Sequence, residues 1–159
     1  MAGIDTSSSG NLEAFGGDVT LTGSTISVGP INAIAINETV DADVLQGGTV
    51  DLIGTANTLY GDIETTNASI TIGGTATVTN DITVRSDGNG GEITFVDEIN
   101  APSDEPNTHT LTLDSGDSLI ILNGIGTIAT LDEFVIEGSG PVQLSGEFIF
   151  SEEQIFDNP

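Results

Sequence analysis

The sequence predicts an all-β protein built as a parallel β-solenoid of about five or six coils. Apolar and polar residues alternate along many short segments, which is typical of strands with one buried face. Glycine pairs between these segments indicate tight turns. These segments group into blocks that open at residues 17, 48, 68, 91 and 110, roughly 20 to 30 residues apart, which is a repeat length found in solenoids.

Most of the expected strands carry isoleucine, valine, leucine or phenylalanine at every second position, with threonine, serine or an acid between them. The strand at 76–79 has an alanine at one apolar position, and the strand at 134–136 is apolar throughout. The expected strands are, in chain order, residues 19–21, 49–52, 69–72, 76–79, 82–84, 92–95, 110–113 and 134–136. Glycine pairs adjoin the first four and the sixth of these strands, at residues 16–17, 47–48, 73–74 and 90–91. The alternation predicts inward ladders that include Val50, Leu52, Ile70, Ile72, Ile93, Phe95, Leu111 and Leu113.

An antiparallel β-sandwich is the alternative fold, because it also consists of short strands joined by turns. The hairpin signal Asn-Gly occurs only at Asn89 and Asn123, and aromatic residues make up only 4% of the chain. Both features favour the solenoid, whose narrow interior suits small apolar side chains.

The chain divides into three expected parts: a lead-in or cap at residues 1–16, the solenoid at 17–150 and a tail at 151–159. A turn of helix is expected in the tail, with Ser151 as its cap. Residues 101–107 contain two prolines and no large apolar side chain, so they are expected to form a loop that leaves the solenoid. Such loops often carry binding functions.

The charge balance excludes several partners. The chain has 25 acidic residues against a single arginine, Arg85, and a formal net charge of −24. We therefore expect neither nucleic acid nor an anionic membrane surface to bind. No cysteine is present, which excludes disulfides and thiolate sites, and no apolar run is long enough for membrane insertion. The 19 isoleucines and 10 valines argue against acidic disorder.

The most site-like segment is the glycine-rich stretch that contains Asp87, Asn89 and Glu92. Carboxylate and amide oxygens separated by glycines suit calcium, the one cofactor that the sequence suggests. The alternative is a tight turn that binds nothing, and the same choice applies to Asp114 and Asp117.

Two further functions are conceivable for this composition. Threonine pairs such as Thr20/Thr22, Thr75/Thr77 and Thr110/Thr112 resemble an ice-binding face, but other expected strands carry acids at these positions. A sugar-processing β-helix enzyme would find many carboxylates here. Its only basic groups would be Arg85 and His109, and we expect His109 to be a polar surface residue. The sequence therefore favours a non-enzymatic protein, with the enzyme as an alternative.

Residues 47–150 resemble the degenerate coils of filamentous-haemagglutinin-like large bacterial exoproteins. The stretches that carry the resemblance are residues 82–95 and 111–126, followed by a leucine-rich step at Leu131 and a turn at 142–146. The resemblance implies a right-handed parallel β-helix that serves surface adhesion. The chain is much shorter than these proteins and lacks their amino-terminal secretion cap and any signal peptide, so we expect a piece of a longer protein.

The expected function is a structural or adhesive segment of an adhesin-like protein, at the bacterial cell surface or secreted. A host or environmental surface, including glycans, is the expected partner. A calcium-stabilised extracellular assembly module is a further alternative. Exposed strand edges at uncapped ends would also allow end-to-end self-association.

Overall fold

The computed structural model describes residues 3–6, 8–9, 16–36, 45–87, 89–149 and 153–156. Within these residues the chain forms strands and no helix. The strands are β1 (Ile4–Asp5), β2 (Ser8–Ser9), β3 (Val19–Val28), β4 (Ile31–Ala33), β5 (Ala35–Ile36), β6 (Val50–Leu59), β7 (Ile63–Thr66), β8 (Ile70–Val78), β9 (Ile82–Asp87), β10 (Ile93–Phe95), β11 (Ile99–Asn100), β12 (Thr110–Asp114), β13 (Ile120–Leu122), β14 (Glu133–Glu137), β15 (Val142–Leu144) and β16 (Glu153–Phe156).

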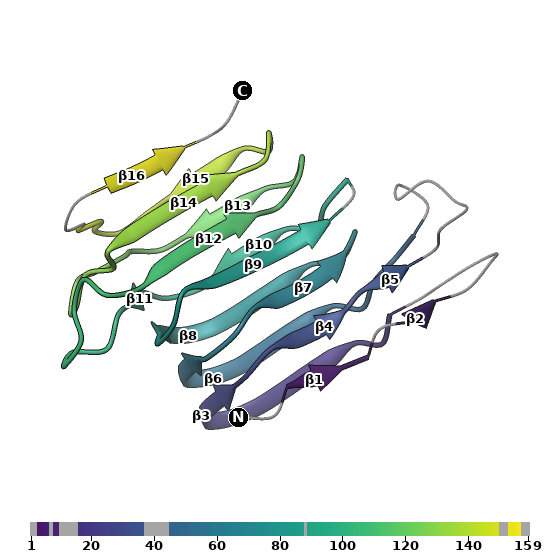
Figure 1. The fold of residues 1–159 in the computed structure, drawn as a ribbon, viewed down its shortest axis with the longest axis horizontal. Coiled ribbons are helices and arrows are strands. Elements are labelled where there is room, and N and C mark those ends of the chain that lie inside the picture. The colour runs from purple at the N-terminus through teal and green to yellow at the C-terminus, as the bar shows by residue number, and fades with distance from the viewer. Residues whose placement is uncertain are drawn as a thin grey trace.

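Most of these strands form two large sheets that face each other, and β2 pairs with β5 in a small third sheet (Figure 1). One is seven-stranded, in the order β1-β4-β7-β9-β12-β14-β16. The other is six-stranded, in the order β15-β13-β10-β8-β6-β3, and β11 also pairs with β8. From β6 to β16 the chain passes back and forth between the two sheets, and β1 and β16 lie at opposite ends of the stack (Figure 1).

All strand pairs in the described part of the chain are parallel. The predicted all-β class and parallel pairing are thereby confirmed, and the antiparallel sandwich considered as the alternative is wrong. Hairpins cannot join parallel strands, so strands that pair with each other are connected through a strand of the opposite sheet. β10 and β11 follow one another in the same sheet, but they both pair with β8 and not with each other. This arrangement is compatible with a β-solenoid.

Apolar side chains line up in ladders between the sheets. The ladder of the six-stranded sheet runs through Val19, Val50, Ile70, Ile93, Ile120 and Val142. That of the seven-stranded sheet runs through Ile4, Ile31, Ile63, Val84, Leu113 and Ile136. All eight residues predicted to point inward are at most 1% exposed. Their burial supplies the main driving force for folding.

Two local expectations differ from the structure. The pair Gly73 and Gly74 does not separate two strands but lies inside β8, where it bends the strand. Gly74 has a φ of 77°, and a Cβ there would lie 2.2 Å from the carbonyl oxygen of Gly54 on β6. Glycine is therefore required by close approach within a strand as well as by backbone conformation.

The tail contains a strand where a turn of helix was expected. Residues Glu153–Phe156 form β16, which pairs with β14 and is an edge strand of the seven-stranded sheet. Ser151, the expected cap, lies outside the described residues. The four residues Glu153–Phe156 show no alternation of apolar and polar side chains from which a strand could be predicted. In the described part of the chain no helix is long and apolar enough to cross a membrane.

Candidate functional site

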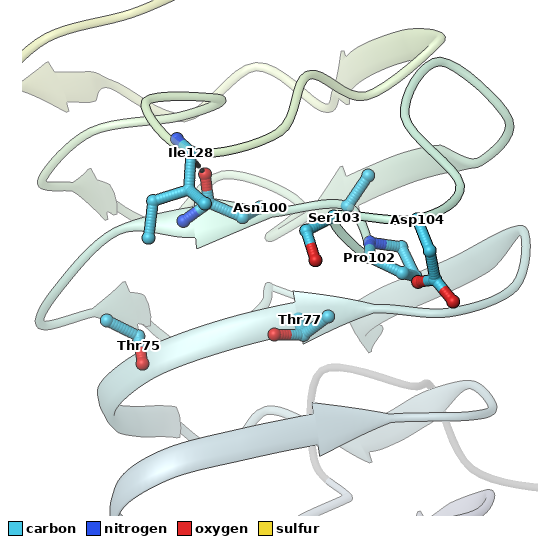
Figure 2. Close-up of a pocket in the computed structure, with 8 residues that line it drawn as sticks. Thr75, Thr77, Asn100, Pro102, Ser103, Asp104 and Ile128 are labelled. Carbon is cyan, nitrogen blue, oxygen red and sulfur yellow. Dashed lines mark hydrogen bonds between the residues drawn. The ribbon is translucent and has the colours of Figure 1, made fainter.

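A surface pocket of about 340 Å³ opens between β8 and the loop that follows β11 (Figure 2). Its volume lies at the lower end of the range for small-molecule sites, about 300–1,000 Å³. The pocket is lined by Thr75, Thr77, Asn100, Ala101, Pro102, Ser103, Asp104 and Ile128. The structure thus brings together two features that the sequence singled out separately, a threonine pair and the loop at 101–107.

The threonines reach the pocket because of strand alternation. Ala76 is fully buried, so its neighbours Thr75 and Thr77 project from the outer face of β8. Thr77 is the register partner of Asn100 on β11, which places their side chains next to each other. The hydroxyl of Thr75 donates to the carbonyl of Thr55 at 3.3 Å.

Asn100 is the most buried polar residue of the pocket, with 4% of its surface exposed. Its side-chain oxygen, Oδ1, accepts hydrogen bonds from the backbone N–H of Ile128 at 2.9 Å and of Ala129 at 3.3 Å. These two donors fix which end of the amide is oxygen, because a flipped amide would set N–H groups against N–H groups. The Nδ2 group therefore faces the other way. Figure 2 shows it directed toward the space between Ile128 and Thr75.

Backbone hydrogen bonds hold the pocket walls in place. The N–H of Ala101 donates to Ala129 at 3.0 Å, and the N–H of Asn107 donates to Thr130 at 2.8 Å. Within the loop, the N–H of Glu105 donates to Pro102 at 3.1 Å. These bonds tie residues 101–107 to the segment around Ile128, so the pocket is formed without a ligand.

The structure gives each of the predicted calcium ligands a partner in its own chain. The Asp87 carboxylate lies 3.1 Å from Nε of Arg85, and that of Glu92 accepts a hydrogen bond from Thr94 at 2.8 Å. The backbone oxygen of Asn89 accepts from the Ser118 hydroxyl at 3.2 Å. No group of three His, Cys, Asp or Glu side chains in the described residues is arranged to hold a metal ion. A calcium site at Asp87, Asn89 and Glu92 stays a prediction.

The carboxylates of the second acidic turn, Asp114 and Asp117, accept hydrogen bonds from other groups of the chain. Oδ1 of Asp114 accepts a hydrogen bond from the N–H of Gly116 at 3.0 Å. The carboxylate of Asp117 accepts one from the hydroxyl of Ser139. The first contact is the side-chain-to-backbone bond of an Asx turn, which accounts for an aspartate at this position.

Arg85 stands in a row of acids on the outer face of the seven-stranded sheet. Its register neighbours are Glu64 on β7 and Asp114 on β12. Its Nη2 lies 3.1 Å from Oε1 of Glu64, and its Nε lies 3.1 Å from Oδ1 of Asp87. The single arginine of the chain therefore offsets repulsion among acids that parallel pairing stacks side by side.

Three aspartates that precede strands accept, through their side-chain carboxylates, a hydrogen bond from a backbone N–H at or next to the neighbouring strand. Asp18 accepts from the N–H of Thr49 at 2.9 Å, Asp62 from that of Thr83 at 2.8 Å, and Asp81 from that of Thr110 at 2.9 Å. This role of the three aspartates was not predicted from the sequence. Its signal is an aspartate immediately before a Val or Ile that opens a strand, as at Asp18, Asp62 and Asp81.

His109 is not the surface residue that was expected, since its side chain is only 13% exposed. Its Nε2 lies 3.7 Å from Oε2 of Glu105, and its backbone oxygen accepts from the N–H of Asp132 at 3.0 Å. His109 thus belongs to the support of the loop behind the pocket and does not line it.

The outward threonines do not form a uniform face. One outer row of the six-stranded sheet runs through Thr20, Asp51, Thr71, Thr94, Ile121 and Gln143.

Comparison of the chain with known protein families, curated proteins and solved structures finds no match.

Proposed function

We propose that the chain is a right-handed parallel β-helix that serves as a non-enzymatic structural or adhesive segment of a bacterial cell-surface or secreted adhesin-like protein. The observation that carries this proposal is the pair of apolar ladders, each of which passes through six strands of one parallel sheet. Such stacking is typical of solenoids, in which each repeat buries the apolar face of its neighbour.

General rules of protein structure support the handedness and the spacer role in this proposal. Parallel strands joined through a crossover are right-handed in nearly all proteins, which favours a right-handed helix. Each added coil lengthens a β-solenoid by about 4.8 Å, so repeats of this kind are suited to spacing parts of a longer chain. The net charge of −24 keeps copies of the segment apart.

The fold is tested by duplicating one coil. Residues 70–92 make up one coil in this arrangement, because Ile93 pairs with Ile70. The chain has no cysteine, so Ser24→Cys on β3 and Gln143→Cys on β15 give two unique sites for spin labels. A second copy of residues 70–92 should increase the distance between the labels by about 4.8 Å. A folded duplicate with an unchanged distance would contradict the β-helix.

The adhesive role is tested with beads that carry the folded chain. Leu52→Asp places a carboxylate in the fully buried ladder and supplies an unfolded control of almost the same composition. Beads with the original chain should be retained on glycan-coated or abiotic surfaces under flow, and beads with the control should not. Equal retention contradicts adhesion by the folded segment, and release of new reducing ends from the glycans contradicts a non-enzymatic role.

A further inference from the structure

We infer that the pocket between β8 and the loop at residues 101–107 binds a neutral saccharide unit. Its polar lining offers both hydrogen-bond donors and acceptors, as a sugar requires, and its apolar lining offers a surface for the sugar's C–H groups. This inference deepens the adhesive role proposed above and rests on it. The bead-retention test measures adhesion by the whole folded chain, and the test below measures binding at the pocket alone. Either of them can therefore fail while the other succeeds.

The first observation is the unused donor of Asn100. Both hydrogen bonds that the described residues make with its side chain go to Oδ1, and none involves Nδ2. The residue as a whole is only 4% exposed, but Nδ2 is not among the buried side-chain atoms of the described residues that lack a hydrogen-bond partner, so this N–H is open on the pocket side. It is therefore a free donor that is held in place by the two bonds to Oδ1. A ligand oxygen in the pocket can accept from Nδ2, and the hydroxyl oxygens of a sugar are such acceptors.

The second observation is the complementary set of groups around that donor. Asp104 is exposed on the loop, and its carboxylate can only accept hydrogen bonds, which a sugar hydroxyl donates. The hydroxyls of Thr77 and Ser103 can donate and accept. Ile128, with 72% of its surface exposed, stands at the opposite wall and offers an apolar surface, as does Pro102. Figure 2 shows Thr77, Ser103 and Asp104 on one side of the opening and Ile128 on the other.

The negative charge of the pocket and of the chain favours neutral saccharides over acidic ones. The pocket lining contains one carboxylate and no basic group, and the chain carries a net charge of −24. An acidic sugar would be repelled by both. The lining also contains no aromatic ring on which a sugar could stack. Binding of a single unit is therefore expected to be weak, and an adhesive segment would gain strength from several copies.

The test is an NMR titration of the whole chain labelled with ¹⁵N. Glucose, galactose and N-acetylglucosamine are the neutral probes, glucuronate and glucosamine are the charged probes, and glycerol controls for non-specific polyol effects. The Asn100 side-chain signals are assigned by their loss in Asn100→Asp, which keeps the oxygen that holds Ile128 and Ala129. We expect these signals to shift saturably with at least one neutral sugar, less with glucuronate and not with glycerol.

A matched pair of variants locates the binding. Thr77→Val should weaken binding by about three- to tenfold, the loss expected for one hydrogen bond. Thr71→Val makes the same change on the same strand but outside the pocket, and it should leave the affinity unchanged. If Asn100→Asp fails to fold, the sugar affinity of Asp104→Asn on the exposed loop provides the second test. Its affinity is compared with that of Glu137→Gln, which makes the same kind of change outside the pocket.

Three results would overturn the inference. One is the absence of saturable shifts at Asn100 with every neutral sugar. Another is equal weakening by Thr77→Val and Thr71→Val, which would place binding elsewhere. The third is saturation by glucosamine alone, which would show a site for cations.

Discussion

The side-chain carboxylates of single aspartates bind backbone N–H groups at or next to neighbouring strands in this protein. Asp81 accepts a hydrogen bond from the N–H of Thr110, which lies on the neighbouring strand. Asp81→Ala should lower the free energy of unfolding by roughly 0.5–1.5 kcal/mol, because the N–H loses its acceptor. Asp81→Asn keeps an acceptor oxygen and removes one repelling charge, so its loss should be smaller. Urea unfolding followed by circular dichroism measures both, and equal losses would contradict the hydrogen-bond role.

Arg85 is the residue whose effect should depend most on salt. Its guanidinium lies between the carboxylates of Glu64 and Asp87, and its side chain as a whole is 38% exposed. Arg85→Gln should destabilise the fold by up to about 1 kcal/mol at low ionic strength. The loss should be smaller at about 0.15 M salt, because salt screens the attraction between exposed charges. Arg85→Lys should recover part of the loss. A loss that does not change with salt would indicate packing of the side chain as its cause.

At the scale of the strand, the bend in β8 depends on one glycine of a pair. Gly74→Ala should destabilise the protein strongly, because a positive φ costs about 1–2 kcal/mol and the new Cβ would meet the Gly54 carbonyl at 2.2 Å. Gly73→Ala is the matched control, since its Cβ would lie 3.4 Å from the nearest atom, the Leu52 oxygen. Thermal unfolding should separate the two variants by several degrees. Similar melting temperatures would contradict a specific role for Gly74.

The edge strand β16 protects the end of the seven-stranded sheet. It covers β14, so deletion of residues 151–159 should expose the pairing edge of β14 to another chain. We expect concentration-dependent association in light scattering, and stronger association at high salt, where the net charge is screened. Deletion of residues 157–159 alone keeps β16 and should leave the chain as it is. Unchanged scattering after the longer deletion would show that β16 is not needed as a cover.

At the scale of the whole molecule, the sequence predicts what depends on alternation and misses what depends on long-range contact. The period of two identifies Val50, Leu52 and their ladder neighbours, because burial there follows directly from strand geometry. The bend at Gly74 depends on how near Gly54 passes, and the burial of Asn100 depends on a segment 28 residues further along the chain. Neither relation has a local signal, which is why the pocket could be anticipated only as a loop and a threonine pair.

The whole molecule should also become more stable as salt is added. With 25 acidic residues and one arginine, most carboxylates have no cationic partner in the chain. Their mutual repulsion acts over about 30 Å at 0.01 M salt and over about 8 Å at 0.15 M. The melting temperature should therefore rise over this range with sodium and potassium alike. A melting temperature that does not respond to salt would contradict repulsion as a significant cost.

Calcium separates this general response from a specific site. A site formed by Asp87, Asn89 and Glu92 would add stability that grows with the logarithm of calcium concentration at constant ionic strength. It would have to draw Asp87 away from Arg85 and Glu92 away from Thr94, so the gain is reduced by the loss of both contacts. Replacement of the three residues by alanine should abolish the calcium-specific increase and leave the general salt response. If about 1 mM calcium raises the melting temperature no more than magnesium at the same ionic strength, the acids act only through their summed charge.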